Sequence, residues 1–455
     1  MLATNSVLRL ARGVVVAATL WLPIAPAWAA LPIQHWQTSS GAAVYFVENH
    51  DLPILDLAVN FPAGSSRDSR EKAGLAGLTQ HMMSLGAAGL TDSEIASRMA
   101  DLGAILGGEQ DQDRASLSLR TLSSARESAA ALALFAKILQ QPDFPESVLE
   151  REKARIVAGL QEAATQPESI SDKAFTAALY GDHPYGIANA ESPTSVAAIQ
   201  RADLQQFYQT HYRAQGAVIA IMGDVSKAQA AQIAESLTTG LPQGAKVDTA
   251  PPAVPYPAEA RIERIPHPAS QSHILLGYPG IKRGDPDYFP LYVGNYILGG
   301  GGFVSRLTEE VREKRGLVYS VYSYFLPLRE LGPFQIGLQT KGEQADEALK
   351  VVRQTLANFI QKGPTAKEMK AAKDNIIGGF PLRIDSNGKI LSYLSVIGFY
   401  GLPLTYLDDF NQQIAKVTPA QVKDAFARRV QPDRMVTVIV GGDVTAGGDA
   451  KSGQN

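Results

Sequence analysis

The stretch FYQTHYRAQGAVIAIMGDV, residues 207–225, is matched without a gap by FARRVQPDRMVTVIVGGDV, residues 426–444. In both copies the end of an amphipathic helix leads through a short polar turn into a β-rich apolar run that closes on Gly-Asp-Val. One strand ending in Gly-Asp arises by chance, but a helix, turn, strand and closing tripeptide in the same register indicate duplication. The copies begin 219 residues apart (426 minus 207), so the chain is predicted to have two homologous halves.

The boundary between the halves is predicted at residues 242–260, PQGAKVDTAPPAVPYPAEA. Proline removes backbone donors and favours extended conformations, so this segment is predicted to be a semi-rigid linker. The domains are then residues 30–241 and 261–447, and the small polar residues 448–455 are predicted to be a disordered tail.

Residues 1–29 have the pattern of a cleaved secretory signal peptide. Arg9 and Arg12 precede the apolar run GVVVAATLWLPIA, and Ala27-Trp28-Ala29 gives an A-x-A cleavage pattern. The apolar run is shorter than the about 20 residues that span a bilayer. We therefore expect export to the periplasm of a Gram-negative cell, without stable membrane insertion.

The composition and the hydrophobic periodicity together indicate a globular α+β protein. The 455 residues include no cysteine and carry a formal charge of −3 without a basic stripe, so disulfides are excluded and nucleic acid is a poor partner. Helical segments such as SAAALALFAKILQQ alternate with period-two strands, in which Leu117 and Leu119, or Phe334, Ile336 and Leu338, alternate with polar or small residues. Each half is predicted to be a sheet with one buried and one wetter face, covered by helices.

The segment GLAGLTQHMMSLG, residues 74–86, has the layout of a metal-binding helix without most of its ligands. A helix over residues 72–85 places Gly77, Gln80 and His81 on one face. Catalytic zinc needs three protein ligands and a nearby carboxylate that takes a proton from its water. Glycine has no side chain and a glutamine amide cannot act as a base. On this chemistry alone, His81 is a structural histidine and the chain holds no metal.

GLAGLTQHMM is similar to the active-site segment of the pitrilysin/insulinase family of zinc metallopeptidases, especially its processing-peptidase branch, where the pattern is G-L-A-H-x-x-E-H-M. The resemblance continues in DLGAILGGEQDQDRASLSL (101–119), in HPYG (183–186), in the first repeat copy, and in the C-terminal signature GGGGFVSRLTEEVREKRGLVYSVYS (299–323). It implies two homologous α+β domains, each an antiparallel-rich sheet covered by helices, that face a partner's pair across an enclosed chamber.

The resemblance places the family's first zinc histidine at Gly77, its general-base glutamate at Gln80 and its second histidine at His81. The third ligand, a glutamate, falls within residues 157–159, which contain no acid, and Glu162 one turn further on is the alternative. Since two of three ligands and the base are missing, we expect no peptide hydrolysis by this chain alone. Zinc is expected in a partner subunit.

The substrate side of the family's site is intact. The resemblance assigns to Arg312 and Tyr319 the arginine and tyrosine that help to bind and polarise the scissile peptide. An arginine can donate to a carbonyl, and a tyrosine hydroxyl can stabilise the oxyanion that develops on attack. Without the resemblance, the chemistry favours Arg312 as one more solvated charge in EEVREKR and Tyr319 as a residue packed in a strand.

Gly300, Gly301 and Gly302 lie in the run LGGGGFVSRL. No G-K-[ST] follows, so a phosphate loop is weakly supported. The resemblance implies a flexible loop that contacts substrate, as in the non-catalytic subunit of the processing peptidases. A structural glycine turn is the alternative.

We therefore predict a non-catalytic, substrate-binding subunit of a heterodimeric periplasmic zinc metallopeptidase. Its partner is a homologous chain with an intact H-x-x-E-H, and its substrate is a peptide or unfolded polypeptide. The alternative is a stand-alone peptide-binding or chaperone-like pseudoenzyme. A different hydrolase is less well supported, because the chain has no G-x-S-x-G motif and no cysteine nucleophile.

Overall fold

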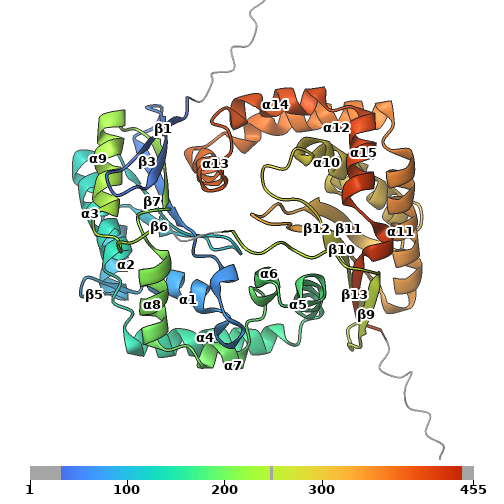
Figure 1. Cartoon of the computed structure of the whole chain (residues 1–455), viewed down its shortest axis with the longest axis horizontal. Helices are drawn as coiled ribbons and strands as arrows, with labels where there is room; N and C mark the ends of the chain where they lie inside the picture. Colours follow the sequence, from blue (N-terminus) through green and yellow to red (C-terminus); the bar gives the residue numbers. More distant parts are fainter. Residues whose placement is uncertain (1–31, 246–249, 443–455) are drawn as a thin grey trace, which may run out of the picture. The chain divides into compact units, whose positions relative to one another are not determined.

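The computed structural model describes residues 32–245 and 250–442. The predicted signal peptide, part of the linker and the tail with the end of the second repeat copy lie outside these residues. Each half of the described chain is built on one large sheet with helices packed around it (Figure 1). The predicted α+β class with two domains is therefore confirmed.

Apart from β1, which has no counterpart in the second sheet, the two large sheets repeat the same strand order. The first runs β1-β2-β8-β3-β7-β6, and the second, in the opposite sense of the list, runs β9-β13-β10-β12-β11. The first sheet consists of β1 (Gln34–Gln37), β2 (Ala43–Glu48), β3 (Ile54–Phe61), β6 (Ile105–Gly107), β7 (Ala115–Leu122) and β8 (Val218–Gly223). The second consists of β9 (Arg261–Ile265), β10 (Gln271–Pro279), β11 (Val318–Phe325), β12 (Pro333–Lys341) and β13 (Val436–Val440).

The repeated sequence occupies equivalent places in the two sheets. Helix α8 (Arg201–His211) leads into β8, and helix α15 (Pro419–Arg429) leads into β13. Strand β8 pairs parallel with β2 and antiparallel with β3, while β13 pairs parallel with β9 and antiparallel with β10. The last strand of each half thus enters its sheet between the first two long strands, as duplication predicts.

Helices follow the strands in both halves. Those of the first half are α1 (Leu75–Met82), α2 (Asp92–Asp101), α3 (Ala125–Gln140), α4 (Glu146–Ala163), α5 (Pro167–Tyr180), α6 (Pro184–Ile187), α7 (Pro193–Ala197), α8 (Arg201–His211) and α9 (Lys227–Thr238). Those of the second half are α10 (Tyr288–Asn295), α11 (Ala345–Lys362), α12 (Ala366–Gly379), α13 (Asn387–Tyr400), α14 (Tyr406–Lys416) and α15 (Pro419–Arg429).

Each sheet also packs against one helix from the other half. Helix α13 of the second half contacts β8, β3 and β2, and helix α5 of the first half contacts β10 and β13. In Figure 1 each of these two helices lies beside the sheet of the opposite half. Glycine permits the close approach in both places. A Cβ on Gly398 of α13 would lie 2.5 Å from Val218, and one on Gly277 of β10 would lie 2.3 Å from the Phe175 ring.

This exchange corrects the prediction of one wetter face for each sheet. Gln335 of β12 is buried although the alternation places it on the polar side of the strand. Asn60 of β3 is also buried, and its amide donates to Ser395 Oγ of α13 at 3.1 Å. The polar sides of the strands are covered because a helix of the opposite half lies over each sheet.

A buried carboxylate joins the halves. Asp113, which follows β6, accepts hydrogen bonds from Tyr185 Oη at 2.8 Å, from the Arg329 backbone N–H at 2.7 Å and from Tyr400 Oη at 2.9 Å. Tyr185 belongs to the HPYG motif, and its neighbour His183 is hydrogen-bonded to Pro252 O at 2.8 Å. HPYG is thus part of the contact between the halves and of the packing of the linker.

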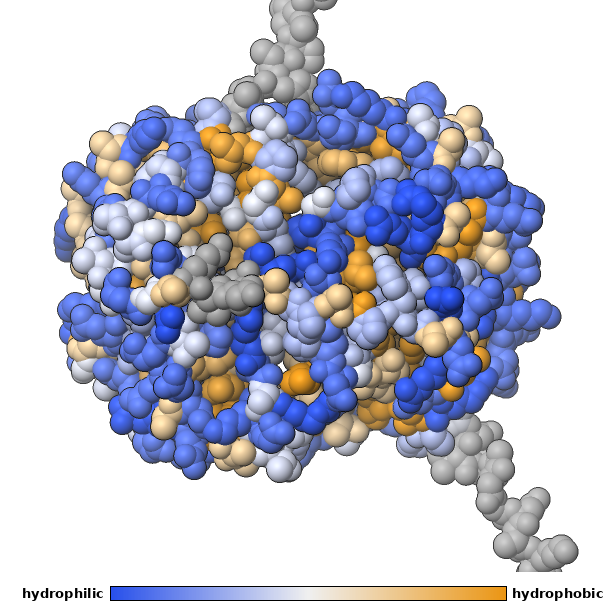
Figure 2. Space-filling view, viewed as in Figure 1, coloured by the Kyte–Doolittle hydropathy of each residue, from blue (hydrophilic) through white to orange (hydrophobic). Residues whose placement is uncertain are grey.

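The face shown in Figure 2 is mainly hydrophilic, with hydrophobic residues in small separate groups. Among the described helices, none has the length and apolar character needed to cross a bilayer.

Candidate functional site

Helix α1 carries the degenerate metal motif. It runs from Leu75 to Met82, shorter than the predicted 72–85, because Arg70–Lys72 form a separate 3-10 turn. The carboxylate of Asp68 accepts from the Gly74 and Ala76 backbone N–H groups at 2.9 and 2.8 Å and so caps the helix. Burial raises the pKa of Asp68 to about 7, against the lowering by these two hydrogen bonds.

The face of α1 that carries the motif lacks the metal-binding and basic side chains, but the volume that such side chains would fill is open. Gln80 Nε2 donates to Ser116 O of β7 at 3.0 Å, which is a packing role. A Cβ on Gly77 would meet only Gln110 Oε1, at 3.7 Å, and one on Gly159 would meet nothing within 4 Å. The two glycines at predicted ligand positions therefore leave open volume where side chains are missing.

His81 has an acidic partner that the sequence analysis missed. Its Nε2 lies 3.0 Å from Glu152 Oε2 of helix α4. Glu152 precedes residues 157–159, the predicted position of the acid, and the alternative candidate Glu162 does not contact His81 in the described structure. In the charged run EREKAR, Glu152 resembles a residue of a solvated helix face. Nothing in the spacing shows that it is turned inward to the His81 imidazole.

Two arginines surround this carboxylate. Arg155 Nε donates to Glu152 Oε2 at 2.8 Å, and Arg151 Nε donates to Oε1 at 3.0 Å. Arg155 Nη2 also lies 3.3 Å from His81 Nε2. Burial raises the pKa of Glu152, but hydrogen bonds from Arg155, His81 and Arg151 outweigh this effect and bring the pKa to about 2.

These residues do not fit a zinc site. No group of three or more metal-binding side chains comes together within residues 32–245 and 250–442. The one histidine and the one carboxylate present are both in contact with the Arg155 guanidinium. A fixed positive charge thus lies beside the groups that would otherwise bind a cation.

Arg312 and Tyr319 lie together. Arg312 belongs to the short π-helical segment η5 (Thr308–Glu313), and its guanidinium carbon is 5.7 Å from the centre of the Tyr319 ring and 5.0 Å from that of Phe303. π-Helical turns are rare and occur often at functional sites. Tyr319 lies on β11 where the register with β12 shifts between Val318 and Ser320. Such irregularities re-aim a side chain, and the Tyr319 side chain is 78 % exposed.

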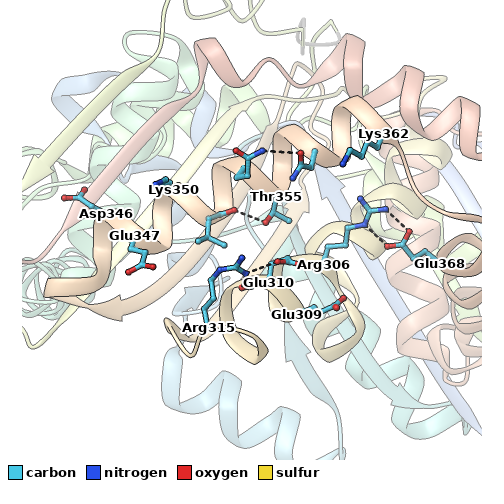
Figure 3. A pocket seen from close by; sticks show the side chains of 13 residues that line it. Arg306, Glu309, Glu310, Arg315, Asp346, Glu347, Lys350, Thr355, Lys362 and Glu368 are labelled. Atoms are coloured by element: carbon cyan, nitrogen blue, oxygen red, sulfur yellow. Dashed lines mark hydrogen bonds and ion pairs between the residues drawn. The ribbon is translucent and has the colours of Figure 1, made fainter.

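The neighbouring charges of EEVREKR pair with one another. In Figure 3, Arg315 meets Glu310 and Arg306 meets Glu368 in the groove between η5 and α11, at 2.8 and 2.6 Å. Lys314 is 2.7 Å from the same Glu310. The carboxylate nearest to Arg312 is Glu313, at 3.7 Å, which is beyond a hydrogen bond. Arg312 thus has a looser ion pair with its neighbour Glu313 and does not contact the Glu310 carboxylate that Lys314 and Arg315 share.

The glycine run adopts helical turns. Gly300 ends the π-turn η3 (Tyr296–Gly300), and Gly302 begins the 3-10 turn η4 (Gly302–Val304) with φ +62°. A Cβ on Gly299 would lie 2.5 Å from Ser323 Oγ, so the run packs closely on β11 at one end. Contact of Gly300, Gly301 and Gly302 with substrate remains a prediction.

Comparisons with known proteins agree with this architecture. Residues 44–191 match the family model described as insulinase (peptidase family M16), and residues 198–376 match the model described as peptidase M16 inactive domain. The chain belongs to the insulinase family, M16. The resemblance given by the sequence motifs is thereby confirmed.

Several relatives within M16 have similar length. A Helicobacter pylori protein named non-peptidase homolog YmxG is 25 % identical over 404 residues, covering 87 % of this chain and 91 % of its own. A Bacillus subtilis protein named uncharacterized zinc protease YmxG is 24 % identical, covering 79 % and 86 %. The solved structure of a peptidase M16 inactive domain from Pseudomonas fluorescens has a TM-score of 0.87 and 40 % identity, covering 90 % and 98 %. The M16 fold is thus shared over nearly the whole described chain.

Proposed function

We propose that this chain is the non-catalytic, substrate-binding subunit of a heterodimeric periplasmic zinc metallopeptidase. The observation that carries the proposal is the contrast between its two sites. At the degenerate metal motif, the Arg155 guanidinium lies against both His81 and Glu152. At the second site, Arg312 lies beside Tyr319 and has no carboxylate within hydrogen-bond distance among the described residues.

In this proposal the peptide bond is cut at the zinc of a homologous partner with an intact H-x-x-E-H. Arg312 donates to a substrate carbonyl, and the Tyr319 hydroxyl stabilises the oxyanion that forms during attack. Preorganised donors of this kind act where charge develops in the transition state and cost little reorganisation. This chain contributes no metal and no general base. The proposed location follows from the sequence of residues 1–29.

The test is reconstitution with the intact-motif homologue, followed by measurement of kcat/KM on an unstructured peptide. Arg312→Ala or Tyr319→Phe should lower kcat by about 10²–10³, the usual cost of one oxyanion-hole donor. Association, checked by size-exclusion chromatography, should be unchanged.

Two neighbouring residues provide matched controls. Arg315→Ala removes an arginine of the same run that is paired with Glu310, and Tyr322→Phe removes a hydroxyl from the same strand. Both should leave turnover near normal. Near-normal turnover by both Arg312→Ala and Tyr319→Phe would show instead that the subunit is only a scaffold. Tight peptide binding by this chain, with no gain in activity from any partner, would favour the stand-alone pseudoenzyme.

A further inference from the structure

A pocket of about 310 Å³ lies between helices α10 and α14 and contains no residue of the proposed function. Its apolar walls include Tyr288 and Phe289 at the start of α10, Leu402 before α14, and Tyr406 at the start of α14. The Phe289 and Tyr406 rings lie 5.8 and 6.4 Å from the buried ring of Phe410, so the core of this half holds them in place. Concave, mainly apolar pockets of about this size are typical of small-molecule sites.

Arg283 is a half-buried arginine of this pocket whose guanidinium has no acidic partner. Among the residues that the structure describes, its side chain makes no hydrogen bond or ion pair, and its Nε is buried without an acceptor. Asp285, two residues further along the same turn, accepts from Arg429 Nη2 at 3.0 Å instead. Because buried donors in proteins normally have acceptors, the free guanidinium indicates a place for an anionic group.

The position of Arg283 is fixed by the surface beneath it. Its guanidinium carbon lies 5.2 Å from the centre of the Tyr400 ring, and Tyr400 Oη donates to the buried Asp113 carboxylate at 2.9 Å. The Arg283 backbone N–H donates to Leu328 O at 2.6 Å. An aromatic ring stabilises a guanidinium without using its N–H donors, so these donors remain available to a ligand.

Asp409 supplies an opposite charge in the same pocket. Thr405 Oγ1 donates to its Oδ2 at 2.6 Å, but no cation lies within ion-pair distance of this carboxylate in the part of the chain that the structure describes. Opposite charges on one pocket wall are stabilised when they pair. In the groove of Figure 3, Arg315 and Glu310 do so at 2.8 Å. Arg283 and Asp409 stay apart, which suits a ligand that carries both complementary charges.

We propose that this pocket binds a small zwitterion with an apolar side chain, an amino acid or a dipeptide. Its carboxylate pairs with Arg283, its ammonium pairs with Asp409, and its apolar side chain packs on Tyr288, Phe289 and Leu402. The two sources share this chemistry and differ in the distance between their charges. The inference is independent of the proposed function, because none of the lining residues belongs to α1, η5 or β11.

Isothermal titration calorimetry on the purified chain tests the site. The probes are phenylalanine and alanyl-phenylalanine, each also prepared in an N-acetylated form, which lacks the ammonium, and as a C-terminal amide, which lacks the carboxylate. The zwitterion should bind about tenfold or more tightly than either of its derivatives, the usual effect of one hydrogen bond to a charged group. Comparison of the two zwitterions shows whether the charge separation of an amino acid or of a dipeptide fits better.

Two variants separate contact with the ligand from support of the pocket. Arg283→Gln should bind the zwitterion and its amide about equally, and Asp409→Asn should bind the zwitterion and its N-acetyl form about equally. A matched control for the arginine is Arg428→Gln, because Arg428 pairs with Asp287 at 2.7 Å and does not line the pocket. Asp408→Asn removes the neighbouring carboxylate of α14, which is also outside the pocket. Both controls should keep the two preferences.

The proposal is overturned if neither zwitterion binds at millimolar concentrations. It is also overturned if Arg283→Gln weakens the zwitterion and both derivatives by the same factor, because the arginine would then support the pocket without contacting a carboxylate. Thermal unfolding of the two pocket variants should match that of the unmodified chain, since neither side chain has an ion-pair partner in the described structure.

Discussion

His81 Nε2 lies 3.0 Å from Glu152 Oε2 and thereby ties helix α1 to helix α4. In a metal site a histidine and a carboxylate come together to share a cation. Here the cationic groups are the guanidinium groups of Arg151 and Arg155, which donate to the two oxygens of the same carboxylate. His81, Glu152 and the two arginines thus form an ion-pair cluster, whose effects on stability and on metal binding can be measured.

Glu152→Gln should destabilise the protein at neutral pH. The pKa of Glu152 falls from 4.5 to about 2 in the folded chain, so the ionised form stabilises the fold above about pH 4.5. The stabilisation is lost as the pH falls from about 4.5 towards 2. Because the arginine side chains are 53 and 64 % exposed, we expect about 1–2 kcal/mol rather than the full linkage value. Urea unfolding at pH 7 and at pH 3 should show the difference shrinking at the lower pH, and a difference independent of pH would contradict it.

Arg155 should oppose metal binding even when a ligand is restored. The unmodified chain should hold no stoichiometric zinc, and Gly77→His alone should bind it weakly because the guanidinium lies 3.3 Å from His81 Nε2. Combining Gly77→His with Arg155→Ala should increase zinc affinity by at least about tenfold, since a like charge is removed from beside the ion. A competition assay with a chelating dye measures this.

Arg151→Ala in the same Gly77→His background is the control, because Arg151 contacts Glu152 but not His81. It should give a smaller gain. Equal affinity with and without Arg155, or one tightly held zinc per unmodified chain that is lost in His81→Ala, would overturn the interpretation.

The exported form should begin at Ala30, because Ala27 and Ala29 are the small residues that a signal peptidase reads. Intact-mass measurement of the protein from the periplasmic fraction checks this. A mass that includes residues 1–29 would argue against cleavage at this position.

Local sequence patterns located the repeat and the degenerate motif, because each is encoded within a few neighbouring residues, whereas Arg312 and Tyr319 were assigned by the family resemblance. The helix and strand of residues 207–225 recur in α15 and β13 for this reason. The exchange of α5 and α13 was not predictable in the same way. The sequence pattern of an amphipathic helix indicates which face is buried, but it does not indicate which sheet that face packs against.

Glu152 and Asp113 were missed for a related physical reason. Both stand in charged segments, EREKAR and EQDQDR, whose local composition is that of solvated surface. Their burial depends on segments far away in the chain. Asp113 accepts hydrogen bonds from Tyr185, Arg329 and Tyr400. Glu152 lies against His81 of helix α1 and also accepts hydrogen bonds from Arg151 and Arg155 of its own helix. Period and composition report on neighbours in sequence, so they are silent about partners brought by tertiary folding.

Asp113→Asn should loosen the contact between the two halves. The carboxylate accepts from Tyr185 Oη on one oxygen, and from the Arg329 N–H and Tyr400 Oη on the other. An amide of the same size turns an NH₂ group towards at least one of these donors, which leaves a buried donor unpaired. Hydrogen bonds to a buried charged group are worth about 1.5–3 kcal/mol, so we expect a loss of about 2–4 kcal/mol in the free energy of unfolding.

Because Tyr185 and Tyr400 belong to different halves, the loss should also reduce the cooperativity of unfolding and separate the transitions of the two halves in urea. Tyr400→Phe, which removes one hydrogen bond, should cost about 1 kcal/mol. Asp385→Asn, which breaks an exposed pair with Lys389, should change stability by less than about 0.5 kcal/mol. If Asp113→Asn unfolds in a single transition at the same urea concentration as the unmodified chain, the buried carboxylate does not hold the halves together, and their association must rest on the other contacts between them, such as those of helices α5 and α13.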